Sequence, residues 1–128
     1  MVRRDACEAI GILLVDDELS FRTSLAAMLR DDGHEVRDYA APAEVPPLRD
    51  LEDVAVVVTD YEMPGSTGLV LADDLHAHHP EMPVLLVTAY RTQSLEAQVL
   101  DRPHLRIVQK PVDYETIHTL IHEIVRCI

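Results

Sequence analysis

The sequence contains five polar residues at or just after the ends of strand-like runs, and together their types suit the binding of a phosphoryl group. They are Asp16, Asp17, Asp60, Thr88 and Lys110. Ionised carboxylates placed together repel one another, and Mg²⁺, which prefers oxygen ligands, removes that repulsion. Three carboxylates, Mg²⁺ and the lysine ammonium sum to zero charge, so an anionic phosphoryl group can be met by the metal, the ammonium and the hydroxyl. Asp60 stands alone after its run and is the candidate nucleophile for forming an aspartyl phosphate.

Five apolar runs of strand length would have to position these residues. The predicted strands are Ile10–Val15, Val36–Ala40, Val54–Thr59, Val84–Thr88 and Leu105–Gln109. Continuous apolar runs are typical of strands that are covered on both faces, as in a parallel sheet. The carboxyl ends of parallel strands share one edge of the sheet, where the ligand crevice of such folds lies. Any one of the polar residues could be an ordinary turn or capping residue, so their expected convergence at this edge is what indicates a site.

Helical patterns alternate with these strands and predict an α/β fold. The predicted helices are one around Phe21–Leu29 that stops at Gly33, a short one over Ala43–Leu51, two over Leu69–His78 and Ser94–Leu100, and a last one that begins at an Asp113 N-cap. Pro46 and Pro47 fit only the first turn of the short helix. Five strands alternating with five helices predict an open, doubly wound parallel sheet with helices on both faces.

The composition predicts one globular domain and excludes several classes of protein. The 128 residues carry a formal net charge of −12, with 48% hydrophobic and 27% charged residues. That length suits a single domain over residues 1–128, and the composition excludes wholesale disorder. No apolar run approaches the ~20 residues of a membrane span, and the acidity argues against direct binding to nucleic acid or to anionic membranes. The only two cysteines, Cys7 and Cys127, are typical of a reducing cytosolic compartment, so we expect a cytoplasmic protein.

Seven histidines raise the question of a metal site. His118 and His122 lie four residues apart on the last predicted helix. Two histidines at this spacing, without a glutamate beside the first and without a third ligand, do not make a zinc site. We therefore expect the histidines to lie in solvent near the C-termini of helices, where the helix dipole favours them.

The order and spacing of the motifs resemble the receiver domain of a bacterial two-component response regulator. The resemblance extends from about Ile10 to Val125. It rests on Asp16-Asp17, on Asp60 followed by Met63-Pro64 and Gly68, on Thr88-Ala89, and on Lys110-Pro111. It implies a flavodoxin-like five-stranded parallel sheet in the order 2-1-3-4-5, with five helices.

The resemblance also implies a role for each residue of the site. Asp60 would be the phosphoacceptor, and Asp17 and Asp60 would bind Mg²⁺ directly. Asp16 would act mainly through a water, and the backbone carbonyl of Glu62 would complete the metal site. Thr88 and Lys110 would contact the phosphoryl group. The Lys110–Pro111 peptide bond would be cis, as is usual in this family.

Several positions depart from the common pattern of the family or are variable within it. Ile107 occupies the position of the usual switch aromatic, and Tyr90 is an alternative whose role is open. Glu62 and Tyr90 occupy the two positions that tune dephosphorylation, and a carboxylate and a bulky ring there predict slow autodephosphorylation. The segment Asp101–His104 replaces the usual glycine-containing approach to the last strand.

The implied function is a phosphorylation switch. A sensor histidine kinase would donate the phosphoryl group, and the output would be a downstream protein target or a histidine phosphotransfer protein. We expect no DNA-binding output domain, no membrane partner and no enzymatic activity beyond assistance to the domain's own Mg²⁺-dependent phosphorylation and dephosphorylation. The sequence leaves a homodimer, the cognate kinase and a larger parent protein open.

Two other interpretations of the same residues compete with the switch. A phosphohydrolase of the haloacid-dehalogenase type would use Asp16 as nucleophile with Glu18 as the second acid, but that family has an aspartate at this second position. A degenerate receiver would act only as a docking module, and the intact set of five chemical residues argues against it.

Overall fold

A five-stranded parallel sheet forms the centre of the computed structural model, which describes residues 9–125. Its strands are β1 (Gly11–Val15), β2 (Glu35–Tyr39), β3 (Val56–Asp60), β6 (Val84–Thr88) and β7 (Leu105–Gln109). They lie in the order β2-β1-β3-β6-β7, and every neighbouring pair is parallel. The predicted flavodoxin-like order 2-1-3-4-5 is therefore confirmed. The strand order reverses at β1 and β3, which is where the crevice of such a sheet is expected.

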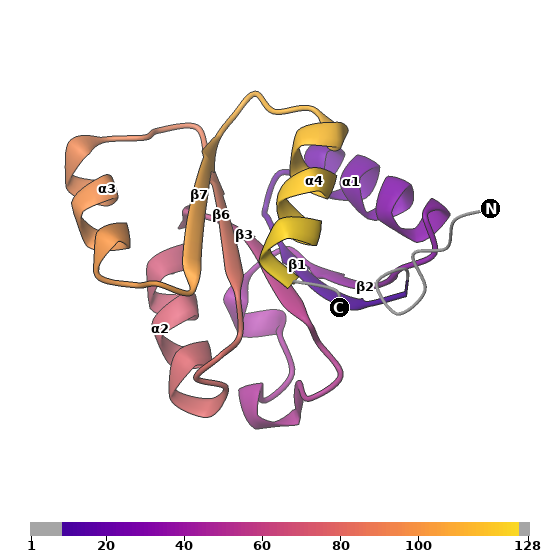
Figure 1. Cartoon of the computed structure of the whole chain (residues 1–128), viewed down its shortest axis with the longest axis horizontal. Coiled ribbons are helices and arrows are strands. Elements are labelled where there is room, and N and C mark those ends of the chain that lie inside the picture. The colour runs from indigo at the N-terminus through magenta and orange to yellow at the C-terminus, as the bar shows by residue number, and fades with distance from the viewer. Residues whose placement is uncertain (1–8, 126–128) are drawn as a thin grey trace.

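Four α-helices cover the two faces of this sheet (Figure 1). They are α1 (Leu19–Asp31), α2 (Gly68–His78), α3 (Gln93–Leu100) and α4 (Tyr114–Val125). Apolar side chains of α1 and α4, among them Leu29 and Ile121, pack with one face of the strands. Those of α2 and α3, among them Leu75 and Leu95, pack with the other. The apolar runs of the strands are buried because both faces are covered.

The predicted helix over Ala43–Leu51 is wrong. The described residues contain two separate 3-10 turns there, Pro42–Glu44 and Leu48–Asp50, so they form four α-helices where five were expected. Pro46 and Pro47 have no N–H to donate and push the preceding residue towards extended backbone. Val45 accordingly has a ψ of 137°. The segment still contributes to the core, because Leu51 is completely buried.

The other helix ends follow the sequence signals. Gly33 ends α1 with a φ of 97°, a left-handed conformation that glycine adopts without strain. The Oδ1 atom of Asp113 accepts a hydrogen bond from the backbone N–H of Thr116 at 2.9 Å, so the predicted N-cap of α4 is confirmed. Thr67 caps α2 in the same way by accepting from the N–H of Val70.

A small antiparallel hairpin that the sequence did not predict follows β3. Its strands are β4 (Glu62–Met63) and β5 (Ser66–Thr67), joined by Pro64 and Gly65. The Lys110–Pro111 peptide bond is cis, as the resemblance implied. Among residues 9–125, none of the helices has the length and hydrophobicity that a membrane crossing requires. Cys7 and Cys127 lie outside the described residues.

Candidate functional site

The strand register brings the predicted site residues to one edge of the sheet. Val15 pairs with Thr59, Asp60 with Val87, and Thr88 with Gln109. The residues that follow these pairs therefore leave the sheet side by side. They line a pocket of about 260 Å³ formed by Asp17, Glu18, Asp60, Glu62, Thr88, Ala89, Tyr90 and Lys110.

Three carboxylates converge beside this pocket. Carboxylate oxygens of Asp16, Asp17 and Asp60 all lie within 4.8 Å of one another. Asp16 is buried, Asp17 is exposed, and the side chain of Asp60 is 14% exposed. The loop after β1 holds Asp16 in place, because its Oδ1 atom accepts a hydrogen bond from the backbone N–H of Glu18 at 2.8 Å. A donor set made only of carboxylate oxygens fits a hard divalent cation such as Mg²⁺.

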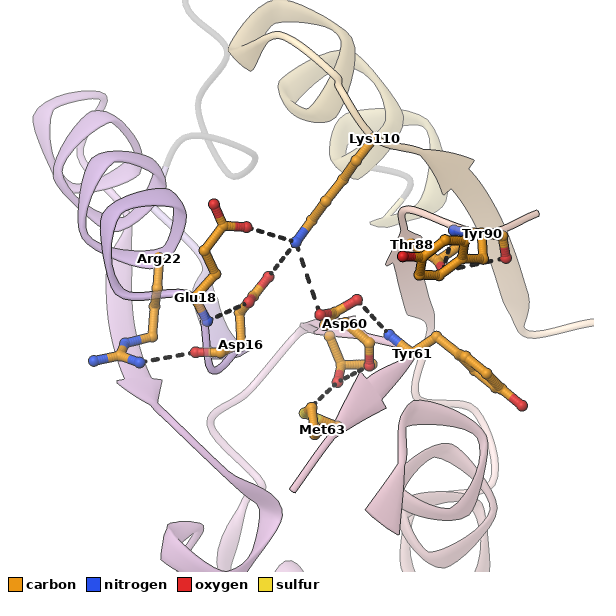
Figure 2. Close-up of polar contacts among 10 residues, drawn as sticks. Asp16, Glu18, Arg22, Asp60, Tyr61, Met63, Thr88, Tyr90 and Lys110 are labelled. Carbon is orange, nitrogen blue, oxygen red and sulfur yellow. Dashed lines mark hydrogen bonds and ion pairs between the residues drawn. The ribbon is translucent and has the colours of Figure 1, made fainter. Parts of the chain in front are cut away.

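Lys110 supplies the positive charge of the site. Its Nζ atom lies 3.0 Å from Asp16 Oδ2, 3.4 Å from Glu18 Oε1 and 3.8 Å from Asp60 Oδ2 (Figure 2). Burial alone would lower the pKa of Lys110, but the hydrogen bond and charge of Asp16 and the charge of Asp60 raise it, so the side chain is an ammonium. Three residues, Pro111 to Asp113, connect this lysine to the first residue of α4.

Asp60 has its two carboxylate oxygens in different environments. Oδ1 accepts a hydrogen bond from the backbone N–H of Tyr61 at 2.8 Å, and Oδ2 faces Lys110 (Figure 2). Burial and then the neighbouring charge of Asp16 raise the pKa of Asp60 to about 6, against the opposing effect of Lys110. A carboxylate whose charge is disfavoured in this way gains from binding a cation.

The Thr88 hydroxyl is engaged by the loop that follows β6. Its Oγ1 atom accepts from the backbone N–H of Tyr90 at 3.0 Å and donates to the Tyr90 carbonyl at 3.3 Å. Thr88 is buried at the base of the pocket, whereas Tyr90 is 63% exposed at its mouth. The hydroxyl therefore belongs to the pocket but is directed to the loop in this conformation.

Two supporting contacts escaped the sequence analysis. The ring of Phe21, at the start of α1, lies with its centroid 4.4 Å from Lys110 Nζ, which places an aromatic face under the ammonium. Arg22 donates from Nη1 to the backbone carbonyl of Asp16 at 2.8 Å and from Nε to Asp38 Oδ2 at 3.0 Å. In the sequence, Phe21 indicates only an apolar position on a helix. Asp38, a charged residue in the predicted second strand, could have indicated an ion pair with a basic residue such as Arg22.

Gly68 connects Asp60 to α2 by close packing. The backbone N–H of Gly68 donates to the carbonyl of Tyr61 at 2.7 Å. A Cβ atom at this position would lie 2.4 Å from the backbone oxygen of Asp60 and 2.6 Å from the side chain of Leu86. The first residue of α2 can therefore approach the end of β3 only because it is a glycine.

Comparison with known proteins finds a family model that matches most of this chain. The family model described as the response regulator receiver domain matches residues 12–122. The response regulator protein FleR of Pseudomonas aeruginosa is 31% identical over 114 residues, which are 88% of this chain and 24% of FleR. PgtA of Salmonella typhimurium, a phosphoglycerate transport system transcriptional regulatory protein, is 28% identical over 116 residues, which are 91% of this chain and 28% of PgtA. The chain thus spans about a quarter of the length of these relatives.

Solved structures show the same fold. The CheY-like response regulator receiver domain protein of Methanospirillum hungatei aligns with a TM-score of 0.84 and 25% identity, over 91% of this chain and 94% of that one.

Proposed function

The chain belongs to the response regulator receiver domain family, and on that premise we propose that it is a phosphorylation switch whose phosphoacceptor is Asp60. One observation supports this assignment above the others. The half-buried carboxylate of Asp60 lies at the end of the central strand, within 4.8 Å of the Asp16 and Asp17 carboxylates and 3.8 Å from the Lys110 ammonium. A nucleophile, a cation site and a positive charge are the groups that phosphoryl transfer requires of a protein.

The carboxylate cluster is the proposed Mg²⁺ site. Asp17 and Asp60 would hold the ion directly, Asp16 would act through a water, and the backbone carbonyl of Glu62 would complete the set. The acidic donor chemistry of the pocket supports this choice. When bound, Mg²⁺ neutralises charge on the transferring phosphoryl group.

The residues of the chain divide the transfer step among them. An oxygen of Asp60 forms a bond to phosphorus while the bond from phosphorus to the donor histidine nitrogen breaks. Lys110 stabilises the added negative charge through its ammonium. The Thr88 hydroxyl can contact the phosphoryl group only after it leaves the backbone of Tyr90, to which it is bonded at 3.0 Å. That exchange of partners is the difference in contacts on which a two-state switch depends.

The proposed partners follow from this chemistry. A sensor histidine kinase supplies the phosphoryl group, and a downstream protein or a histidine phosphotransfer protein receives the signal. The net charge of −12 favours protein partners over direct contact with nucleic acid. The proposal is therefore a receiver domain that signals through protein contacts and does not itself bind nucleic acid.

Incubation with acetyl phosphate and Mg²⁺ tests the proposal. We expect intact-protein mass spectrometry to show the gain of one phosphoryl group by the wild-type protein and none by Asp60→Asn. Asp74→Asn, which removes an exposed carboxylate of α2, is the matched control and should be phosphorylated normally. Phosphorylation that persists in Asp60→Asn would contradict the assignment and would favour a phosphohydrolase that uses Asp16.

Tyr90 is expected to slow the loss of the phosphoryl group. Its exposed ring and the exposed Glu62 both line the mouth of the pocket, where an attacking water must enter. Tyr90→Ala should therefore shorten the phosphoryl half-life severalfold, measured by loss of the mass gain after the donor is removed. Arg91→Ala, which changes the next exposed residue, should leave the half-life unchanged. A wild-type half-life of only seconds would contradict this prediction.

A further inference from the structure

Three histidines gather on the face of the sheet that carries α1 and α4, away from the carboxylate pocket. His34 lies between α1 and β2, and His118 and His122 lie on α4. Their Nε2 atoms converge: His34 Nε2 is 3.5 Å from His118 Nε2, which is 3.0 Å from His122 Nε2. One ligand nitrogen from each ring lies within 4.8 Å of the others. The fold thus brings a third histidine to the i,i+4 pair of the last helix.

The ring orientations bring the nitrogen edges of His34 and His118, and of His118 and His122, towards each other. The ring centroids of His34 and His118 are 5.6 Å apart and those of His118 and His122 are 4.3 Å apart, in both cases farther than the corresponding Nε2 atoms. The His118 and His122 rings meet edge to face at 72°. In a tetrahedral site with Zn–N bonds of about 2.0–2.1 Å, the ligand nitrogens lie about 3.3–3.4 Å apart. The two Nε2 separations bracket that value.

A carboxylate lies beside the three rings. Asp32 Oδ2 is 3.7 Å from His118 Nε2 and accepts a hydrogen bond from the Tyr114 hydroxyl. The side chain of His118 is 23% exposed, and a surface pocket lined by His118, Thr119, His122 and Glu123 opens next to it. His34, by contrast, is only 5% exposed. The site therefore has one buried ligand, two half-buried ligands, and access for an ion and a water.

We infer that His34, His118 and His122 form a zinc site that joins the C-terminal helix to the start of β2. Imidazole nitrogens suit Zn²⁺ and other first-row transition metals, whereas Mg²⁺ requires oxygen ligands. Three histidines would leave the fourth coordination position of the zinc ion to water. The Asp32 carboxylate is near enough to the cluster to reduce the free-energy cost of placing the positive charge of the ion there. The expectation that the histidines lie in solvent is wrong for His34, which is buried and lies beside the i,i+4 pair.

Binding requires protons to leave at least two of the Nε2 atoms, since the 3.0 Å hydrogen bond between His118 Nε2 and His122 Nε2 needs a proton on one of them. The backbone N–H of Ile10 lies 3.4 Å from His34 Nδ1, which makes Nδ1 an acceptor and puts the ring proton on Nε2. Zinc at Nε2 would move this proton to Nδ1 and remove the contact with Ile10. A hydrogen bond of that length is weak, so a metal–nitrogen bond can replace it.

The test measures metal binding by the full chain. With Zn²⁺ added to the metal-free protein in excess Mg²⁺, we expect one equivalent to bind with micromolar or tighter affinity in calorimetry and to raise the melting temperature. Co²⁺ should give the intense visible absorption of a four-coordinate site. His122→Ala and His118→Ala should weaken zinc binding by at least about 100-fold. His34→Ala should also weaken zinc binding. Because His34 is buried, circular dichroism will check that this variant still folds.

Three controls separate this site from the others in the chain. His78→Ala removes an exposed histidine of α2 and should bind zinc as the wild type does. Asp17→Asn changes the carboxylate pocket and should also retain the zinc, as should Cys7→Ser/Cys127→Ser. Zinc binding that is lost in any of these variants, or retained in His118→Ala and His122→Ala, would overturn the proposal, as would the absence of binding. Phosphorylation by acetyl phosphate is a separate measurement, so its failure would leave the zinc result unaffected.

Discussion

Asp60→Asn is expected to raise the free energy of unfolding by roughly 1–2 kcal/mol at about pH 8 when no divalent cation is present, although it abolishes phosphorylation. The raised pKa of Asp60, about 6 against 3.8 for an unperturbed carboxyl, means that the ionised side chain disfavours the folded state. Burial and the nearby Asp16 are the two main causes. Asparagine keeps the shape of the side chain and removes its charge. The 3.0 Å contact of Lys110 with Asp16 does not involve Asp60, so we expect the variant to keep it.

The sign of this effect depends on pH. Between the unfolded pKa of 3.8 and the folded pKa of about 6, the folded protein binds more protons than the unfolded one, so the stability contributed by Asp60 falls as pH rises. The penalty is complete only well above the folded pKa of about 6 and disappears below the unfolded pKa of 3.8. The advantage of Asp60→Asn over the wild type should therefore shrink as the pH is lowered through this range.

Chemical denaturation of both proteins in EDTA, at several pH values, measures the difference. Addition of Mg²⁺ should narrow it, because the ion stabilises the wild-type carboxylate cluster more than the variant. Asp74→Asn, in an exposed part of α2, should show no comparable gain. An Asp60→Asn protein that is less stable than the wild type at about pH 8 would contradict the electrostatic account.

Gly68→Ala is expected to cost about 2–3 kcal/mol of stability, even though alanine is the better helix former. The added methyl group would lie 2.4 Å from the backbone oxygen of Asp60 and 2.6 Å from the Leu86 side chain. Leu86 can adjust, but the backbone oxygen cannot move without displacing the end of β3. The variant should therefore also bind Mg²⁺ more weakly, because Asp60 is displaced with its backbone.

Urea denaturation and Mg²⁺ titration check both parts of this prediction. Gly65→Asn is the matched control, because a Cβ atom at Gly65 meets nothing within 4 Å and asparagine tolerates its φ of +80°. That control should lose little stability and keep its Mg²⁺ affinity. A Gly68→Ala protein as stable as the wild type would show that α2 can shift away from β3.

The sheet and the carboxylate pocket were predictable from the sequence because each rests on a local pattern. Apolar runs such as Val84–Thr88 indicate buried parallel strands wherever they occur, and a parallel sheet puts all their carboxyl ends at one edge. The polar residues that follow three of these runs can then be assigned to this edge without any knowledge of packing. Asp16, Asp60 and Lys110 were found in this way.

The errors have one local cause and one that lies in the packing of distant residues. The local cause is in Ala43–Leu51, where Pro46 and Pro47 lack a donor N–H and the chain forms only single turns in place of the expected short helix. His34 lies 84 residues before His118 in the sequence, and only the packing of α4 beside α1 and β2 brings the two together. The contact of Phe21 with Lys110 has the same origin, since an aromatic residue on an apolar helix face gives no sign of the charge that it will meet.

The connection from Lys110 to α4 behaves as a tether with little slack. Its three residues span at most about 11 Å, and Pro111 fixes one of the backbone angles. A shift of the Lys110 backbone towards Asp60 would therefore pull on the first turn of α4, where Tyr114 holds Asp32 of the neighbouring helix end. The position of α4 is thus the feature of the molecule that would change most directly when Lys110 moves in the pocket.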